Sequence, residues 1–221
     1  MGTAPSGERG RDVRFEADFY RRYYGNPATC VASEADIGRL ADFVCAYTAY
    51  LGFRVTRVLD AGCGLGQTRA AVRRFFPRAT WTGLEASEYL ASEHGWVHGR
   101  LEDYRSRSPF DLILCNDVLQ YVEDRPAARA LANLGRLSRG AVYFRALTAG
   151  DWRSVADRTR SDGAVHLRPV EWYRRRLARH FRPVGGGLLA RRGCLPLLWE
   201  LEQPWTVPGS GGHRGPAQRR P

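Results

Sequence analysis

The stretch 58–67 limits what this chain can fold into more than any other part of it. It reads VLDAGCGLGQ, with glycines at the alternate positions Gly62, Gly64 and Gly66, and with Asp60 two positions before the first of them. An apolar run leads into the stretch, and apolar residues at helical spacing follow it, so we expect the glycines on a turn between a buried strand and a helix. Such a turn offers bare backbone N–H groups to a ligand above the strand end.

The spacing of these glycines separates two kinds of nucleotide site. A dinucleotide-binding turn has the pattern G-x-G-x-x-G, whereas this chain has G-x-G-x-G after an acid. The segment VLDAGCGLG resembles the first motif of class I S-adenosylmethionine (SAM)-dependent methyltransferases. The resemblance implies that the first strand end and its turn bind SAM through Asp60, Gly62, Cys63, Gly64 and Gly66.

A second acidic residue stands at the expected tip of the next strand. Residues 80–84 predict that strand, and Glu85 follows it. An acid in this place can accept hydrogen bonds from both hydroxyls of a ribose. The sequence GLEAS resembles the second methyltransferase motif, which implies that Glu85 and Ala86 lie at the SAM ribose.

The exit of a short third strand, near residues 96–98, is the place where the family holds the adenine of SAM. The acid that usually follows the glycine there is replaced by Arg100 in this chain. The resemblance therefore assigns the adenine contacts to the backbone, with Glu102 or Asp103 as an alternative acid, and the expected residues are Arg100, Leu101 and Glu102.

The segment 110–121, FDLILCNDVLQY, predicts a central parallel strand, because its apolar run is continuous. Its tip should lie beside the glycine turn, and it resembles the fourth methyltransferase motif, which faces the methionine part of SAM. Asn116 and Asp117 are therefore expected at the cofactor. Asp117 and Tyr121, where relatives often carry His, are also candidate catalytic residues.

The candidate general base is His166, in the irregular segment 148–168 that follows the fifth strand. In this fold the segment after that strand commonly determines acceptor specificity. A neutral imidazole there can take a proton from a hydroxyl or amine acceptor. The alternative is that His166 is a surface or packing residue and that methyl transfer needs positioning alone.

An aromatic stretch, 15–24, predicts a helix near the start of the chain. One hypothesis makes it a lid over the cofactor, with Tyr24 among the cofactor contacts. The other makes it a plain cover for the sheet.

We predict a class I methyltransferase Rossmann-like fold, with a seven-stranded, mostly parallel sheet and helices on both faces. The methyltransferase domain should span 13–203, with disordered ends at 1–12 and 204–221. We also expect a capping box at Ser33, a helix that ends at Gly140, a helix from Pro169 whose apolar face reaches Phe181, and a closing antiparallel pair formed by 185–189 and 194–199.

Composition limits the choice of partners. All 34 basic residues are Arg, and the net charge is +11. The absence of Lys is typical of a GC-rich genome, so the charge is only weak support for RNA binding. The chain lacks the Asn/Asp-Pro-Pro-aromatic run and the Pro-Cys pair of DNA methyltransferases, so no DNA substrate is expected. We also expect no membrane partner, no metal, free cysteines and a cytoplasmic location.

The expected reaction is transfer of the SAM methyl group to an O, N or C nucleophile of a small-molecule acceptor. Three alternatives remain at this point: an RNA-modifying methyltransferase, a non-catalytic SAM-binding protein and an NAD-dependent oxidoreductase. Neither the acceptor nor the oligomeric state follows from the sequence.

Overall fold

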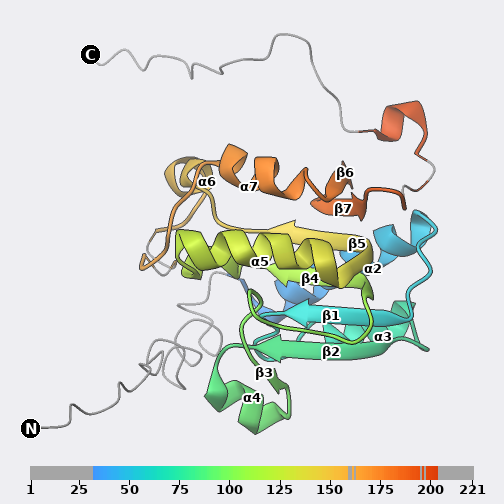
Figure 1. The fold of residues 1–221 in the computed structure, drawn as a ribbon, viewed down its shortest axis with the longest axis horizontal. Coiled ribbons are helices and arrows are strands. Elements are labelled where there is room, and N and C mark those ends of the chain that lie inside the picture. Colours follow the sequence, from blue (N-terminus) through green and yellow to red (C-terminus); the bar gives the residue numbers. More distant parts are fainter. Residues whose placement is uncertain (1–31, 159–160, 162, 195, 197, 204–221) are drawn as a thin grey trace, which may run out of the picture.

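The computed structural model describes residues 32–158, 161, 163–194, 196 and 198–203 (Figure 1). The expected disordered ends and Tyr24 lie outside these residues. A seven-stranded sheet has the order β3-β2-β1-β4-β5-β7-β6, and all its strands are parallel except β7. The strands are β1 (Arg57–Ala61), β2 (Thr80–Glu85), β3 (Val97–His98), β4 (Phe110–Asn116), β5 (Ser138–Arg145), β6 (Phe181–Gly185) and β7 (Leu188–Arg191).

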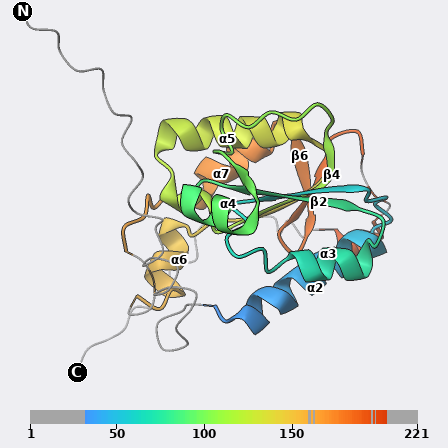
Figure 2. The ribbon, with the colours of Figure 1, turned by 90° about the horizontal axis from the view of Figure 1, so that it is seen from below.

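Helices cover both faces of the sheet, as Figure 2 shows, with α2 and α3 on one face and α5 and α7 on the other. The α-helices are α2 (Glu34–Tyr50), α3 (Arg69–Phe75), α4 (Glu88–His94), α5 (Asp124–Leu137), α6 (Ala149–Ser154) and α7 (Val170–Leu177), and the 3-10 turns are η2 (Leu119–Tyr121) and η3 (Glu200–Glu202). The predicted architecture is therefore confirmed.

Alternating strand residues build two separate hydrophobic cores. Leu59, Ile113 and Val142 point to the side of α5 and α7, while their neighbours Val58, Leu112 and Ala141 point to the side of α2 and α3. All six side chains are fully buried. Because both faces of β1, β4 and β5 are covered, the middle residues of these strands are apolar, and polar residues occur toward the strand ends.

The helix before β1 begins as its sequence predicts. The hydroxyl of Ser33 accepts a hydrogen bond from the amide of Asp36, and the Asp36 carboxylate accepts one from the Ser33 amide, which is the reciprocal capping box. Gly52, just past the helix, has a φ of 78°, as expected for a helix end.

The prediction for Gly140 is wrong. Helix α5 ends at Leu137, and Gly140 lies inside β5. A Cβ atom at this position would lie 2.3 Å from the carbonyl oxygen of Asp111 on β4. Gly140 is therefore required by the close approach of two strands, next to a shift in their register.

The prediction for the last part of the sheet is also wrong in its boundaries. The antiparallel pair is formed by β6 and β7, and Gly186 and Gly187 make the turn between them with φ values of 55° and 79°. Phe181 belongs to β6 and not to the apolar face of α7. The predicted strand 185–189 includes Gly186 and Gly187, whose backbone freedom serves the turn. The segment 148–168 likewise contains the short helix α6.

Candidate cofactor-binding site

The carboxyl ends of β1, β2 and β4 bring three predicted residues to one edge of the sheet. β1 lies between the other two strands, with Asp60 opposite Gly83 of β2 and Leu114 of β4. Glu85 is the last residue of β2, and Asn116 is the last residue of β4. This edge is where open parallel sheets bind ligands.

The glycine turn depends on left-handed backbone conformations. Gly62, Gly64 and Gly66 have φ values of 73°, 51° and 72°. A Cβ atom on Gly62 would lie 2.5 Å from the Val118 side chain, whereas one on Gly64 would meet no described atom within 4 Å. The turn is thus closed on the side of Val118 and open in front of Gly64.

Two side chains hold Gly64 from opposite sides. Its amide donates a hydrogen bond of 2.9 Å to the Glu85 carboxylate, and its carbonyl accepts one of 3.1 Å from the indole nitrogen of Trp96. Glu85 is buried and also accepts a hydrogen bond from the amide of Ser87. Trp96 did not figure among the expected site residues, because a single Trp between α4 and β3 gives no signal of this contact.

Asp60 lies beneath the turn. Its side chain is buried and accepts a hydrogen bond from the hydroxyl of Thr68, at the start of α3. Burial raises the pKa of Asp60 to about 7, the nearby Glu85 carboxylate adds to the rise, and the Thr68 hydroxyl opposes it. Asp60 therefore links the turn to the start of α3 through this hydrogen bond.

Two amide oxygens near the tip of β4 are buried without a hydrogen-bond partner among the described residues. They are Oδ1 of Asn116 and Oε1 of Gln120, and Gln120 is only 4% exposed. Buried amide oxygens in proteins are normally paired. Asn116 ends β4 and Gln120 lies in η2, which follows it, so this region can accept hydrogen bonds from a bound molecule.

Asp117 is held in an unusual conformation. Its φ is 55°, the one non-glycine positive value in the described chain. Its amide donates to the carbonyl of Arg145 at the end of β5, and the Arg145 guanidinium binds both oxygens of its carboxylate. Such backbone strain is commonly found at ligand sites. This carboxylate is thus already paired with a cation.

Residues 163–168, which precede α7, lie at the same edge. The amide of His166 donates a 2.7 Å hydrogen bond to the carbonyl of Gln120, although the His166 residue as a whole is exposed. The segment therefore runs beside the turn that carries Tyr121, which is half-buried. The structure brings the backbone of His166 next to that turn.

Arg168 fixes the end of this segment, and the sequence patterns did not predict a role for it. It is 3% exposed, donates to the carbonyls of Leu119 and Val122, and forms an ion pair with Asp124. Its guanidinium also stacks on Trp172, 4.8 Å from the ring centre. In a chain with so many arginines, nothing in the sequence distinguishes this buried one.

The turn after β3 lies against Glu85. The amide of Gly99 donates to the carbonyl of Glu85, and the imidazole of His98 contacts the carbonyl of Ala86 at 3.2 Å. Leu101 and Glu102 are buried, while Arg100 is exposed. Asn133 of α5 fixes this turn by donating to the carbonyl of Leu101.

Two kinds of feature do not occur in the described part of the chain. It holds no group of three or more His, Cys, Asp or Glu side chains placed to bind a metal ion. It also has no helix with the length and apolar character needed to span a membrane.

Comparisons with known proteins identify the family. A family model described as a methyltransferase domain matches residues 34–190. The trans-aconitate 2-methyltransferase of Deinococcus radiodurans is 33% identical over 86 residues, which cover 35% of this chain and 32% of that protein. The matched part thus spans about a third of the length of that curated relative.

Solved structures of low identity share the fold. The sugar N-methyltransferase of a Streptoalloteichus species is 17% identical, with a TM-score of 0.58 over 86% of this chain and 98% of that one. Magnesium protoporphyrin IX methyltransferase from Synechocystis, crystallised with SAM, is also 17% identical, with a TM-score of 0.56 over 82% of this chain and 94% of that one. The family model covers well over half of the chain, and the sheet order and the glycine turn agree with it. The chain belongs to the methyltransferase family and has the class I methyltransferase fold.

Proposed function

We propose that this protein transfers the methyl group of SAM to a nucleophile on a small molecule, at the carboxyl edge of β1, β2 and β4. The observation that carries the proposal is the open glycine turn, held between Glu85 and Trp96. The match to a methyltransferase domain and the fold of relatives crystallised with SAM support it.

The residues at this edge fit SAM in three ways. The open space in front of Gly64 lets a ligand approach the backbone. The Glu85 carboxylate lies at the strand tip, where it can accept hydrogen bonds from ribose hydroxyls. The unpaired oxygens of Asn116 and Gln120 can accept hydrogen bonds from an ammonium group or a hydroxyl.

The chemistry asks little of the protein beyond positioning. SAM supplies a methyl group on a sulfonium sulfur, and the transfer leaves S-adenosylhomocysteine while the acceptor loses a proton. The task of the chain is to align the two molecules and exclude water, and alignment alone can supply a large share of the rate.

Proton transfer is assigned to His166 and not to Asp117. Both oxygens of the Asp117 carboxylate are bound by Arg145, so we propose that Asp117 shapes the strand tip. The exposed His166 lies beside the turn that carries Tyr121, and Tyr121 is the second candidate. If His166 is the base, His166→Ala should lower turnover about 10²–10⁴-fold with SAM affinity unchanged, and should remove the acid limb of the pH–rate profile.

The proposed acceptor is a small molecule because the relatives of the same fold include enzymes named for a sugar and for a porphyrin.

Calorimetric titration with S-adenosylhomocysteine and with NADH tests the cofactor. We expect saturable binding of the first and none of the second, and the opposite result would overturn the proposal. Transfer of radiolabelled methyl groups to a panel of amino sugars, carboxylic acids and phenols then tests the reaction. If the protein binds S-adenosylhomocysteine but transfers no methyl group to these compounds or to RNA, the result would favour a non-catalytic SAM-binding protein.

A further inference from the structure

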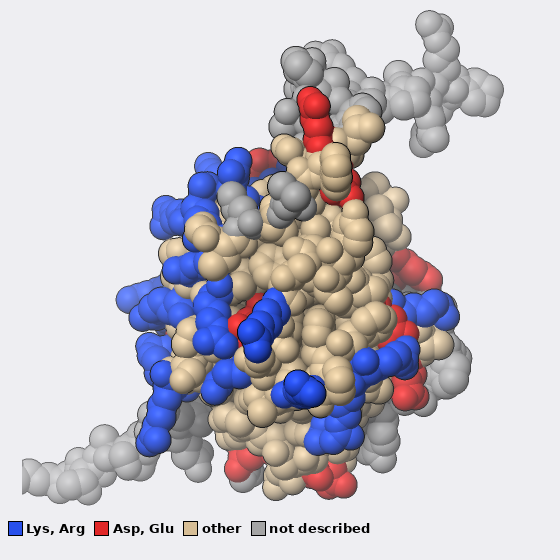
Figure 3. Space-filling model, turned by 90° about the vertical axis from the view of Figure 1, so that its right-hand side faces the viewer, with Lys and Arg blue, Asp and Glu red and all other residues tan. Residues whose placement is uncertain are grey.

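The amino edge of the sheet, opposite the cofactor site, is lined with arginines. Six neighbouring strands reach this edge, in the order β2-β1-β4-β5-β7-β6. The antiparallel strand β7 ends here, and the other five begin here. For each of these strands we define an amino-edge window of five residues: the two strand residues nearest this edge and the three residues of the chain just beyond them. These windows contain ten arginines: Arg54, Arg57, Arg78, Arg107, Arg136, Arg139, Arg179, Arg182, Arg191 and Arg192. Figure 3 looks at this side of the molecule and shows basic side chains gathered on it.

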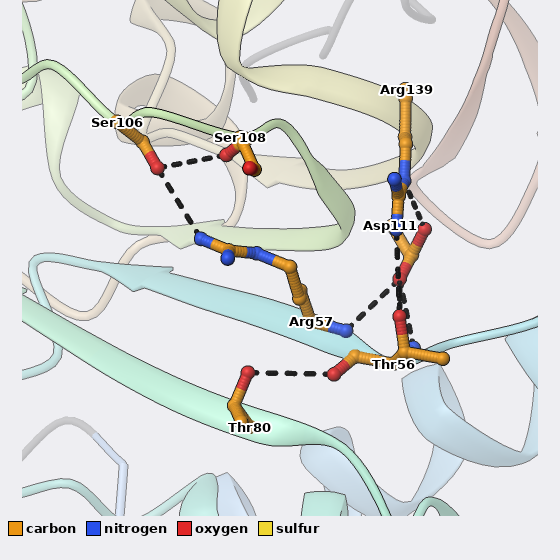
Figure 4. Close-up of polar contacts among 7 residues, drawn as sticks. All are labelled: Thr56, Arg57, Thr80, Ser106, Ser108, Asp111 and Arg139. Atoms are coloured by element: carbon orange, nitrogen blue, oxygen red, sulfur yellow. Dashed lines mark hydrogen bonds and ion pairs between the residues drawn. The ribbon is translucent and has the colours of Figure 1, made fainter.

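Acidic residues do not balance this charge. Asp111 is the one acidic residue in the amino-edge windows, all of which lie in the described chain. Its carboxylate accepts hydrogen bonds from the amides of Thr56 and Arg57 and from the Arg139 guanidinium, at 2.6 to 2.9 Å (Figure 4). Burial opposes its ionisation, but these bonds lower the pKa of Asp111 to about 2. The carboxylate of Asp111 thus links β1, β4 and β5, and it neutralises no arginine other than Arg139 among the contacts described.

Most of the remaining arginines are exposed to solvent, while Arg57 and Arg191 are half-buried. Arg54, Arg78, Arg107, Arg136 and Arg182 are exposed residues at five different strands. A genomic preference for Arg would account for the absence of Lys, but it does not account for ten arginines and a single acid in these windows. An uncompensated row of this kind creates a positive potential that attracts polyanions.

We propose that the amino edge is a docking surface for the phosphate backbone of double-stranded nucleic acid. The charges form a row and not a pocket, since successive strands lie about 4.8 Å apart and six strands span about 24 Å. That length matches roughly seven base pairs of a duplex, which carries a phosphate every 3.4 Å on each strand. The guanidinium group also matches phosphate geometry better than an ammonium group does.

The chemistry of this edge favours a duplex over other anionic partners. No large hydrophobic side chain is exposed within the amino-edge windows themselves; outside them, Tyr50 at the end of α2 and Trp199 and Leu201 at η3 are exposed, and Tyr50 is hydrogen-bonded to Glu202 of η3. Single-stranded nucleic acid would need aromatic side chains for base stacking, and a protein or membrane partner would need apolar anchors. The hydroxyls of Thr80 and Ser106 lie among the arginines but donate to the backbone carbonyls of Thr56 and Ser108 (Figure 4), so the phosphate contacts are assigned to the arginines.

The docked duplex would not be the methyl acceptor. β4 runs from Phe110 at the amino edge to Asn116 at the cofactor edge, a length of about 20 Å. A rigid duplex along one edge cannot present a base at the other. The inference is therefore independent of the proposed methyl transfer, and SAM and nucleic acid should bind without competition.

Fluorescence anisotropy of the full chain with a labelled duplex of about 20 base pairs, over a range of salt concentrations, tests the inference. About four phosphate contacts predict a slope of about −4 in a plot of log K against log salt concentration. The variant Arg54→Ser/Arg107→Ser/Arg136→Ser should reduce the slope to about −1 and weaken binding on the order of 10²-fold at about 0.1 M salt.

The matched control removes the same charge elsewhere. Arg125→Ser/Arg129→Ser/Arg175→Ser changes three exposed residues of α5 and α7, and Arg125 and Arg136 lie at opposite ends of one helix. The control should keep the slope near that of the wild type, and circular dichroism should show both variants folded. Equal losses in the two variants would mean that net charge alone, and not this edge, attracts the duplex.

Two further results would overturn the inference. One is absence of duplex binding by the wild type at low salt. The other is an edge-dependent affinity for a poly-glutamate peptide or an anionic vesicle that exceeds the affinity for the duplex. Saturating S-adenosylhomocysteine should leave the duplex affinity unchanged, and a large decrease would place the two ligands on one surface.

Discussion

The carboxylate of Glu85 accepts a hydrogen bond of 2.9 Å from the backbone amide of Gly64. This bond joins the tip of β2 to the middle of the glycine turn, so the group proposed to bind ribose also holds the turn that lies over the strand. The indole of Trp96 holds the other side of the same residue. Cofactor binding and the shape of the turn are therefore coupled through Gly64.

Glu85→Gln should weaken binding of S-adenosylhomocysteine by about 1–3 kcal/mol, because the amide accepts fewer hydrogen bonds than the carboxylate and loses the charge-assisted contact. Glu85→Ala should weaken binding further, because it also releases Gly64 and Ser87. Calorimetry gives both affinities. Glu88→Gln, in the exposed first turn of α4, is the control and should bind like the wild type. Equal affinity of Glu85→Gln and the wild type would remove Glu85 from the site.

Gly64→Ala should reduce cofactor affinity more than it reduces stability. The new Cβ meets no described atom, so folding suffers only the strain of a φ of 51°, about 1 kcal/mol, while the cofactor loses its approach to the backbone. Gly38→Ala is the matched control within helix α2, where the added Cβ also meets no described atom. It should raise the free energy of unfolding by about 0.5–1 kcal/mol and leave affinity unchanged. A Gly64→Ala variant with wild-type affinity would show that the turn is only structural.

The sequence predicts the structure best at positions where a residue type has a single structural role. Alternate glycines after Asp60, with Glu85 at the next strand end, predicted the turn and both strand tips that the structure has. It was least informative where a residue has several uses. Gly140 marks a close strand contact and not a helix end, and Gly186 and Gly187 make a turn and not a strand. The contacts of Trp96 and Arg168 arise from packing between distant segments, which periodicity does not report.

Asp60→Asn should change how stability depends on pH. The folded-state pKa of Asp60 is raised to about 7, mainly by burial, whereas the unfolded value is about 3.9. Folding therefore takes up a proton between these values, and the stability of the wild type should fall as pH rises from about 4 to about 7. The neutral Asn still accepts the Thr68 hydrogen bond and places no ionised group in the buried site. The variant should therefore be more stable than the wild type at pH 8, by on the order of 2–4 kcal/mol, and similar to it at pH 4.

Denaturant unfolding of the apoprotein at several pH values measures this difference. Asp103→Asn, at an exposed residue, serves as the control and should show no such change. A constant difference between Asp60→Asn and the wild type across the whole range would mean that Asp60 remains ionised in the folded protein.

Arg168→Met should separate the acceptor side of the site from the cofactor side. Arg168 is buried and donates to the carbonyls of Leu119 and Val122, which flank the turn that carries Tyr121. Its removal takes a charged donor from both carbonyl oxygens, although the Leu119 oxygen keeps the amide of Val122, so the free energy of unfolding should fall by about 2–4 kcal/mol. Without the Arg168 contacts, the acceptor should be held less well, so the KM for the acceptor should rise and kcat should fall. The affinity for S-adenosylhomocysteine should stay within about twofold, because β1 and β2 are unchanged. Arg125→Met, an exposed change in the first turn of α5, is the control. A variant whose cofactor affinity falls as much as its turnover would show that Arg168 supports the whole edge and does not position the acceptor segment in particular.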